Sequence, residues 1–258
     1  MKLITANIRF DSPKDGQMSW SHRRVVMAKN LLSYGPDLIA TQEGWRPQLE
    51  DLKGLLSGMQ MAFSNRPWIK ERMYPCIFFN PSSIEILECG EFWLSETPQV
   101  AGSFSFKSSF PRLATWVKAK NLNENFSFMF ISTHLDHVLN STREEQIKVL
   151  LKEVEKINAK KLPCILAGDF NEAPEQRVRA LVTQYAPRLY DPWLKLGHQE
   201  EPSHHYFGPP PQDANRIDWL LVDRRFEAKE IFLDKNHENG IYPSDHYPVK
   251  LEVIFKSS

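Results

Sequence analysis

Residues 163–171 read Pro-Cys-Ile-Leu-Ala-Gly-Asp-Phe-Asn, an apolar run followed directly by Asp169 and Asn171. Short apolar runs bounded by turn residues are typical of fully buried strands. In an extended chain, residues i and i+2 project to the same face, so Asp169 and Asn171 can address one point. Ligands of α/β sheets gather where strands end. This stretch therefore predicts a buried strand that delivers polar side chains to a site.

Two earlier segments repeat this arrangement. Residues 3–8 and 37–43 are apolar runs that carry Asn7 and Glu43 near their ends, and a helical pattern at 23–34 lies between them. Strands that alternate with helices are typical of layered α/β proteins. We expect one domain over residues 1–258. The further elements expected are antiparallel strands and loops across 61–120, a strand at 126–133, a helix that starts with a capping box of Ser141 and Glu144, a helix at 176–184, and strands at 217–222 and 249–255.

Composition narrows the class of protein. The chain has 258 residues, of which 41% are hydrophobic and 25% charged, as in ordinary soluble globular proteins. Lys plus Arg total 32 and Asp plus Glu total 32, so the formal net charge is zero. Proteins that hold long nucleic acids without sequence preference carry a basic excess, which this chain lacks. A local site for a small phosphate ester remains compatible with this balance.

The cysteines and the N-terminal segment indicate a compartment. Cys76, Cys89 and Cys164 are sparse and odd in number, which is typical of reduced thiols. The apolar run after Met1 is too short for a signal peptide, and no run approaches the ~20 residues of a membrane span. We therefore expect a cytoplasmic protein without a membrane span.

Polar side chains recur where the apolar runs end. Each of them alone could be a turn former, a structural ion pair or a buried residue satisfied by backbone, but the joint pattern favours a site. The residues are Asn7, Glu43, His134, Asp136, Asp169, Asn171, Asp218, Asp245 and His246.

The chemistry of this set points to a hard cation and a histidine base. Carboxylates without cysteine ligands suit Mg²⁺ or Mn²⁺, and Glu43, with Asn7 nearby, is the natural ligand. A histidine whose tautomer is fixed by a carboxylate can activate water. His246 fits this role, with either Asp218 or Asp245 as its partner. His134 and Asp136, two positions apart, are expected to share a face.

At this point the chain resembles the endonuclease/exonuclease/phosphatase superfamily of DNase I-like phosphoesterases, in a bacterial branch related to its deadenylase-like members. Each motif alone is weak, and the ordered set is specific. The motifs are Thr5-Ala6-Asn7-Ile8-Arg9, Thr41-Gln42-Glu43, Phe92-Trp93-Leu94-Ser95-Glu96-Thr97-Pro98, Pro111-Arg112-Leu113-Ala114-Thr115-Trp116, Ser132-Thr133-His134-Leu135-Asp136, Gly168-Asp169-Phe170-Asn171, Arg216-Ile217-Asp218-Trp219 and Ser244-Asp245-His246-Tyr247-Pro248.

The resemblance implies an α/β fold of four layers, with two central mixed sheets between helices. It also implies roles for the candidate residues. These are metal binding for Asn7, Glu43 and Asp245, catalysis for His134, Asp169, Asp218 and His246, and phosphate or substrate contacts for Asn171, Arg112 and His205. Either Asp169 or His246 takes the proton of the attacking water.

The implied activity is Mg²⁺- or Mn²⁺-dependent hydrolysis of a phosphodiester or phosphomonoester. Charge neutrality favours a small or short substrate over long duplex DNA. A nucleotide, a short nucleic acid, an inositol phosphate and a phospholipid head group all fit, and the sequence points to no protein partner.

Some positions depart from the family pattern. Met73 stands where many relatives have an acidic residue, with Glu71 two positions earlier. His205 stands in a specialised Ser203-His204-His205 stretch, and either faces the cleft or lies in a solvent-exposed loop. Trp45 and Trp68 lie nearer loops than the other tryptophans and are the better candidates for stacking on a substrate.

Two alternatives use the same residues differently. A noncatalytic relative would bind a phosphorylated ligand or a partner, although such members normally lose a catalytic carboxylate or the last histidine. A zinc hydrolase similar to metallo-β-lactamases would use Thr133-His134-Leu135-Asp136-His137, but Ser132 stands where that motif needs a histidine. Stoichiometric zinc with Mg²⁺-independent turnover would favour the second alternative.

Overall fold

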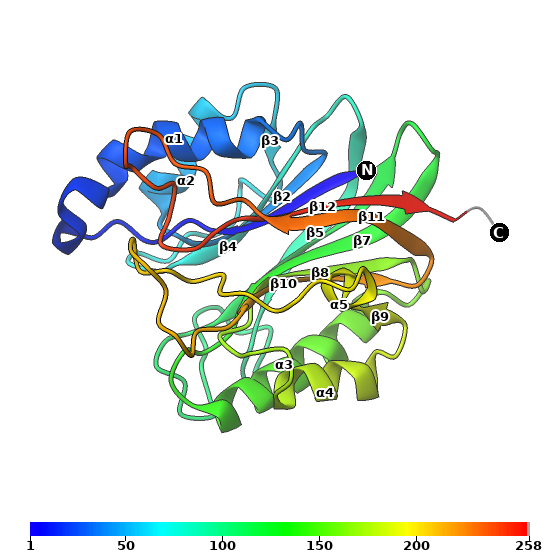
Figure 1. Ribbon diagram of the computed structural model, residues 1–258. Helices are drawn as coiled ribbons and strands as arrows, with labels where there is room; N and C mark the ends of the chain where they lie inside the picture. Colours follow the sequence, from blue (N-terminus) through cyan, green and yellow to red (C-terminus); the bar gives the residue numbers. More distant parts are fainter. Residues whose placement is uncertain (257–258) are drawn as a thin grey trace.

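Two six-stranded sheets form the centre of the computed structural model, which describes residues 1–256 (Figure 1). The first sheet contains, in spatial order, β11 (Phe226–Leu233), β12 (Val249–Phe255), β1 (Lys2–Asn7), β2 (Leu38–Gly44), β4 (Tyr74–Phe79) and β3 (Gln60–Met61). The second contains β5 (Ile84–Trp93), β6 (Leu113–Asn121), β7 (Phe126–His134), β8 (Cys164–Asp169), β10 (Asp218–Asp223) and β9 (Leu189–Tyr190). Both sheets are mixed, since β1 runs parallel to β2 and β7 parallel to β8.

Helices cover the outer face of each sheet. The helices are η1 (Pro13–Met18), α1 (Trp20–Leu32), α2 (Arg46–Leu55), α3 (Asn140–Ile157), α4 (Arg177–Tyr185) and the short α5 (Pro192–Lys195). Figure 1 shows α1 and α2 above the sheets and α3 and α4 below them. The expected four-layer α/β sandwich is therefore confirmed.

Alternation along the strands builds three hydrophobic layers. Leu3 packs between the two sheets, whereas its neighbour Ile4 packs with Met27 and Leu31 of α1. On the other side, Ile131 of β7 packs with Leu150 of α3. Successive strand residues point to opposite faces, so each sheet buries one face against the other sheet and one against helices.

The helix boundaries differ from the predictions at their starts. The first helix begins at Trp20 rather than residue 23. The expected capping box of Ser141 and Glu144 is wrong, because Ser141 lies inside α3 and Leu139 precedes the helix without a side-chain cap. The carboxylate of Asp136 instead accepts from the backbone N–H groups of Val138 and Leu139, at 2.8 and 3.0 Å. A contact from outside the helix thus sets the geometry of its entry.

In the part of the chain that the structure describes, none of the helices is both long enough and apolar enough to cross a membrane.

Candidate active site

Four strand ends meet at one edge of the sandwich, which we call the site edge. The parallel pair β1 and β2 belongs to one sheet, and the parallel pair β7 and β8 to the other. Their carboxyl ends carry Asn7, Glu43, His134 and Asp169. His134 and Asp169 are direct neighbours in the register of the second sheet. Side chains that are distant in sequence are thereby presented by rigid strands to one place.

Gly168 allows the two strands of the second sheet to approach at this edge. It stands beside Thr133 in the register, one residue before Asp169. A Cβ atom on Gly168 would lie 2.2 Å from the carbonyl oxygen of Thr133, a distance that no pair of nonbonded heavy atoms tolerates. Glycine is therefore required for the close pairing that sets Asp169 beside His134.

Buried polar side chains join the two sheets behind the site edge. Nε2 of Gln42 donates to Oγ1 of Thr5 at 3.2 Å and to Oγ of Ser132, in the other sheet, at 3.1 Å. The hydroxyl of Ser132 in turn donates to the carbonyl oxygen of Thr41 at 3.1 Å. Each buried polar atom in this bridge has a partner, as burial requires. The bridge fixes the position of β2, and so of Glu43, relative to β7.

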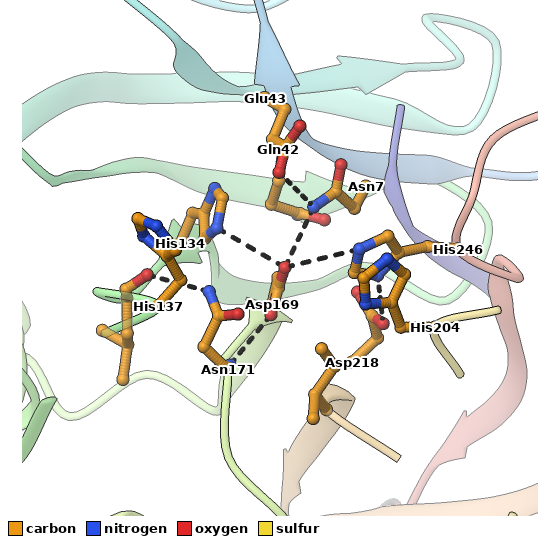
Figure 2. A network of polar contacts seen from close by, with 12 residues as sticks. Asn7, Gln42, Glu43, His134, His137, Asp169, Asn171, His204, Asp218 and His246 are labelled. Atoms are coloured by element: carbon orange, nitrogen blue, oxygen red, sulfur yellow. Dashed lines mark hydrogen bonds and ion pairs between the residues drawn. The ribbon is translucent and has the colours of Figure 1, made fainter. Parts of the chain in front are cut away.

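Asp169 lies at the centre of the site, as Figure 2 shows. Its Oδ2 accepts from Nδ2 of Asn7 at 2.9 Å, and its Oδ1 from the backbone N–H of Asn171 at 2.8 Å. Oδ2 also lies 3.4 Å from Nε2 of His134 and 4.0 Å from Nε2 of His246. The carboxylate thus faces groups from four different segments.

The environment of Asp169 favours its protonated form more than water would. Burial and the nearby carboxylate of Asp218 raise the pKa of Asp169 to about 7, against the opposing effects of His246 and the two hydrogen bonds from Asn7 and Asn171. A carboxylate with a pKa near neutrality is suited to exchanging protons with water.

His246 and Asp218 form a hydrogen-bonded dyad. Nδ1 of His246 donates to Oδ2 of Asp218 at 2.8 Å, which leaves Nε2 facing Asp169. The same Oδ2 accepts from the hydroxyl of Ser203 at 2.7 Å. Burial lowers the pKa of His246, but the carboxylates of Asp218, Asp169 and Asp245 outweigh burial and raise it to about 10. The structure thus selects Asp218, and not Asp245, as the partner of this histidine.

Arg112 fixes the tautomer of His134. Nη1 of Arg112 lies 2.9 Å from Nδ1 of His134, and because a guanidinium can only donate, Nδ1 is the acceptor. Burial and the charge of Arg112 hold the pKa of His134 well below its usual range, so the imidazole is neutral and carries its proton on Nε2. That proton points to Asp169 or to a ligand bound there.

Glu43 and Asp169 are the pair that could hold a cation. Glu43, His134 and Asp169 offer ligand atoms within 4.8 Å of one another. His134 has no free lone pair, as described above, so the two carboxylates are the donors. Carboxylate oxygens suit Mg²⁺ and Mn²⁺, which complete their shells with water and substrate oxygens. The donor set therefore fits such an ion.

Asn7 orients these carboxylates in this structure. Its Nδ2 donates to Oε1 of Glu43 at 3.1 Å as well as to Asp169, and its Oδ1 accepts from the backbone N–H of Arg9. The amide thus presents nitrogen to both acids, and the expected metal contact of Asn7 stays a prediction. The other oxygen of Glu43 accepts from the N–H of Phe10 at 3.1 Å.

Asp245 lies on the other side of His246 and does not join the ligand group of Glu43. Its Oδ2 is 3.4 Å from Nε2 of His204 and 3.7 Å from Nε of Arg9. Burial acts to raise the pKa of Asp245, but His204, His246 and Arg9 keep it below its usual range. The rings of His204 and His246 stack at 4.2 Å and 15°. Parallel rings direct their lone pairs along separate planes, so these two histidines do not converge on one ion.

Asn171 and Asp136 make mainly backbone contacts. Nδ2 of Asn171 donates to the carbonyl oxygen of Leu135 at 3.1 Å, while its backbone N–H binds Asp169. Asp136 is buried and accepts from the N–H of Ser109 at 2.8 Å, besides the two N–H groups before α3. The expectation that His134 and Asp136 address one point is therefore wrong. The same contacts remove Asp136 from the zinc motif considered above.

Neither expected place of His205 is observed, and its neighbour His204 lies at the site instead. His205 is fully buried and stacks on Tyr247 at 4.0 Å, so it neither faces the site nor lies in solvent, and burial lowers its pKa to about 4. His204 instead stacks on His246. Sequence reasoning missed His204 and Ser203 as site residues, although both stand in the stretch that it identified as unusual.

Comparisons with known proteins identify the family and agree with the fold. A model of the endonuclease/exonuclease/phosphatase family matches residues 4–246. The mannosyl-6-phosphatase of Bacteroides thetaiotaomicron is 27% identical, with a TM-score of 0.88, over 99% of this chain and 100% of that chain. A search of curated protein sequences returned no match.

Two further solved structures share the fold at lower identity. An endonuclease/exonuclease/phosphatase from Bacteroides vulgatus has a TM-score of 0.90 at 23% identity, over 98% of each chain. The human nocturnin catalytic domain with bound sulfate anion has a TM-score of 0.73 at 20% identity, over 99% of this chain and 93% of that chain.

Proposed function

Because this chain belongs to the endonuclease/exonuclease/phosphatase family, we propose that it hydrolyses a small phosphoester with the help of Mg²⁺ or Mn²⁺. The observation that carries the proposal is the position of Asp169 between the cation-binding candidate Glu43 and the dyad of His246 and Asp218. A carboxylate with a pKa near 7 at such a place can exchange a proton with water.

The residues divide the work of an in-line displacement. Glu43 would hold the cation, which would supply charge neutralisation on the phosphoryl oxygens. Asp169 orients the attacking water and accepts its proton. His246, held protonated by Asp218, places a cation beside the phosphoryl group, where negative charge builds up.

The remaining side chains position the ester. Nε2–H of the neutral His134 donates to a phosphoryl oxygen, and Arg112 holds that imidazole in the required tautomer. Asn171 lies beside Asp169 at the same end of β8. Asn7 keeps Glu43 and Asp169 at a fixed separation by donating to both.

A phosphomonoester of a sugar is the first substrate to test. Among the similar structures, the mannosyl-6-phosphatase resembles this chain over the full length of both proteins. The balanced charge of the chain also argues against a long polyanion as substrate.

The test is a hydrolysis assay on metal-stripped protein with Mg²⁺ or Mn²⁺ added back. The substrates are mannose 6-phosphate, nucleoside monophosphates, short single-stranded RNA and bis-nitrophenyl phosphate. We expect turnover that Asp169→Ala and His246→Ala reduce at least 100-fold, the scale of general acid–base contributions. Asp213→Ala and His22→Ala, at exposed positions, are the matched controls. Undiminished turnover in either site variant, with an unchanged circular-dichroism spectrum, would contradict the proposal.

A further inference from the structure

A concave surface lies at the segment that follows Glu43 in the chain. Its volume is about 330 Å³, near the lower end of the ~300–1,000 Å³ that is usual for small-molecule sites. Two segments form it, residues 45–47 after β2 and residues 68–72 before β4. Gly44 and Tyr74 are partners in the sheet register, which is why these two segments meet at the site edge.

The first wall of this pocket is Trp45, which is tied to Glu43 through Phe10. The backbone N–H of Phe10 donates to Oε2 of Glu43, and its ring stacks on the indole of Trp45 with centroids 6.2 Å apart and planes at 15°. One face of Trp45 is thus supported by Phe10, and the indole lines the pocket. Trp45 is thereby joined through Phe10 to the carboxylate that is our cation-binding candidate.

The second wall is Trp68, whose orientation is fixed from behind. The buried guanidinium of Arg66 lies 5.2 Å from the Trp68 ring centroid, and Tyr74 packs edge-on at 4.8 Å. On the pocket side, the exposed Arg46 lies 5.7 Å from the same ring. These contacts hold an indole and a guanidinium in fixed positions next to each other. An indole stacks against flat rings, and a guanidinium donates hydrogen bonds to oxygen atoms.

The pocket also holds a donor without an acceptor. Within residues 1–256, Nε of Arg72 is buried and has no hydrogen-bond partner, while Nη1 of Arg72 donates to the backbone oxygen of Glu71. Lys70 and Glu71 pair with each other at 3.3 Å in solvent and contribute little net charge. A buried N–H without a partner destabilises the structure, so an acceptor atom that reaches it would be favoured.

We propose that this pocket binds a ring of the substrate's leaving group, and that the preferred substrate is a small phosphoester whose alcohol part carries a pyranose or a nucleobase. Trp45 and Trp68 contact the ring, and Arg72 and Arg46 donate to its oxygen or nitrogen acceptors. The volume accommodates one such group and not an extended chain. This inference rests on the proposed function, because it gives a binding place to the alcohol part that the proposed hydrolysis releases.

The experiment compares kcat/KM on ring and acyclic phosphomonoesters. The ring esters are mannose 6-phosphate and adenosine monophosphate, and the acyclic ones are glycerol phosphate and phosphoserine. Trp45→Ala should lower kcat/KM for the better ring ester by about 10- to 100-fold, the loss expected when one stacking contact is removed. It should change the acyclic esters less than about twofold. Trp45→Phe should restore most of the loss, and whichever ring ester shows the loss identifies the ring.

Tyr185→Ala removes another exposed aromatic side chain, on α4, and is the control. An equal loss on ring and acyclic esters, or no loss on either, would overturn the proposal. Quenching of tryptophan fluorescence by the same ring esters in Asp169→Asn separates the two proposals. If the wild-type protein hydrolyses none of the esters, but Asp169→Asn shows quenching that Trp45→Phe alters, the proposed function is contradicted and the pocket is retained. If the wild-type protein hydrolyses ring and acyclic esters alike, the pocket is contradicted and the proposed function is retained.

Discussion

Nδ1 of His246 donates to Oδ2 of Asp218 across 2.8 Å, in a fully buried pair that links the segment before β12 to the start of β10. Burial alone would make His246 neutral, so its raised pKa of about 10 depends on the carboxylates around it. The pair therefore sets both the position and the charge of the histidine.

Asp218→Asn should lower the pKa of His246 substantially, because the amide removes the nearest negative charge and leaves the burial. NMR titration of the metal-free protein, followed through the ring carbon resonances of His246, would measure this. The wild-type ring should remain protonated at pH 8. A ring that titrates near 6.5 in the wild type would contradict the assigned dyad.

The same shift makes a prediction about stability and pH. The pKa of His246 is higher in the folded protein than the unfolded value of about 6.5, so its stabilising contribution is fully present below pH 6.5 and is lost as pH rises through about 10. The difference in free energy of unfolding between wild type and His246→Gln should therefore shrink from pH 6 to pH 10. Urea unfolding of metal-free protein at several pH values checks it, and a difference that grows with pH would contradict it.

Arg112→Gln should raise the pKa of His134, since the guanidinium charge is one of the two main causes that depress it. Burial remains, so the value should stay below 6.5. Arg112→Lys keeps a charge but not the planar geometry, and should show a smaller rise. The NMR titration of His134 measures both, with the exposed Arg188→Gln as control. An unchanged His134 in Arg112→Gln would show that the 2.9 Å contact does not govern its protonation.

Glu43→Gln should weaken Mn²⁺ binding at least about tenfold, because the amide offers one neutral oxygen where the carboxylate offers charge. The N–H of Phe10 can still donate to that oxygen, so the fold should be kept. Calorimetric titration with Mn²⁺ measures the affinity. Glu50→Gln, at an exposed position on α2, is the matched control. Equal Mn²⁺ affinity in both variants would remove Glu43 from the cation site.

Gly168→Ala should destabilise the protein by about 1–3 kcal/mol or more, because its methyl group meets a backbone oxygen that cannot move aside. Gly54→Ala is a sharp contrast. Gly54 lies exposed within α2 with open space around it, and alanine there should stabilise by about 0.5–1 kcal/mol. Denaturant unfolding of both variants tests the pair, and similar values would contradict the assigned contact between β7 and β8.

The strands and most of the site were predictable because they depend on local patterns. The last strand has the predicted bounds, 249–255, and strand ends carry the acids at the site edge. An apolar run that ends in Asp169 needs no long-range information to be recognised. Adjacent parallel strands run in the same direction, so their carboxyl ends lie at the same edge of the sheet.

What failed depends on contacts between distant segments. His204 and His246 pair as an isolated bridge, and the N–H of His205 donates to the oxygen of Asp245. This pairing decides which of two adjacent histidines faces the site, and local sequence does not encode it. The carboxylate of Asp136 is likewise indistinguishable in sequence from a catalytic one, yet it accepts from the backbone N–H of Ser109, in a distant loop, as well as from those of Val138 and Leu139 before α3.

The strand order of the two sheets also bears on how the protein is made. The second sheet uses an unbroken stretch of chain from β5 to β10, whereas the first pairs β1 with β12, from opposite ends of the sequence. During synthesis, which proceeds from the N-terminus, the second sheet can be complete while β1 still lacks this neighbour. We expect the nascent chain to expose one long edge of β1 until β12 leaves the ribosome, which makes that edge the natural point for chaperone protection or for misassembly between copies.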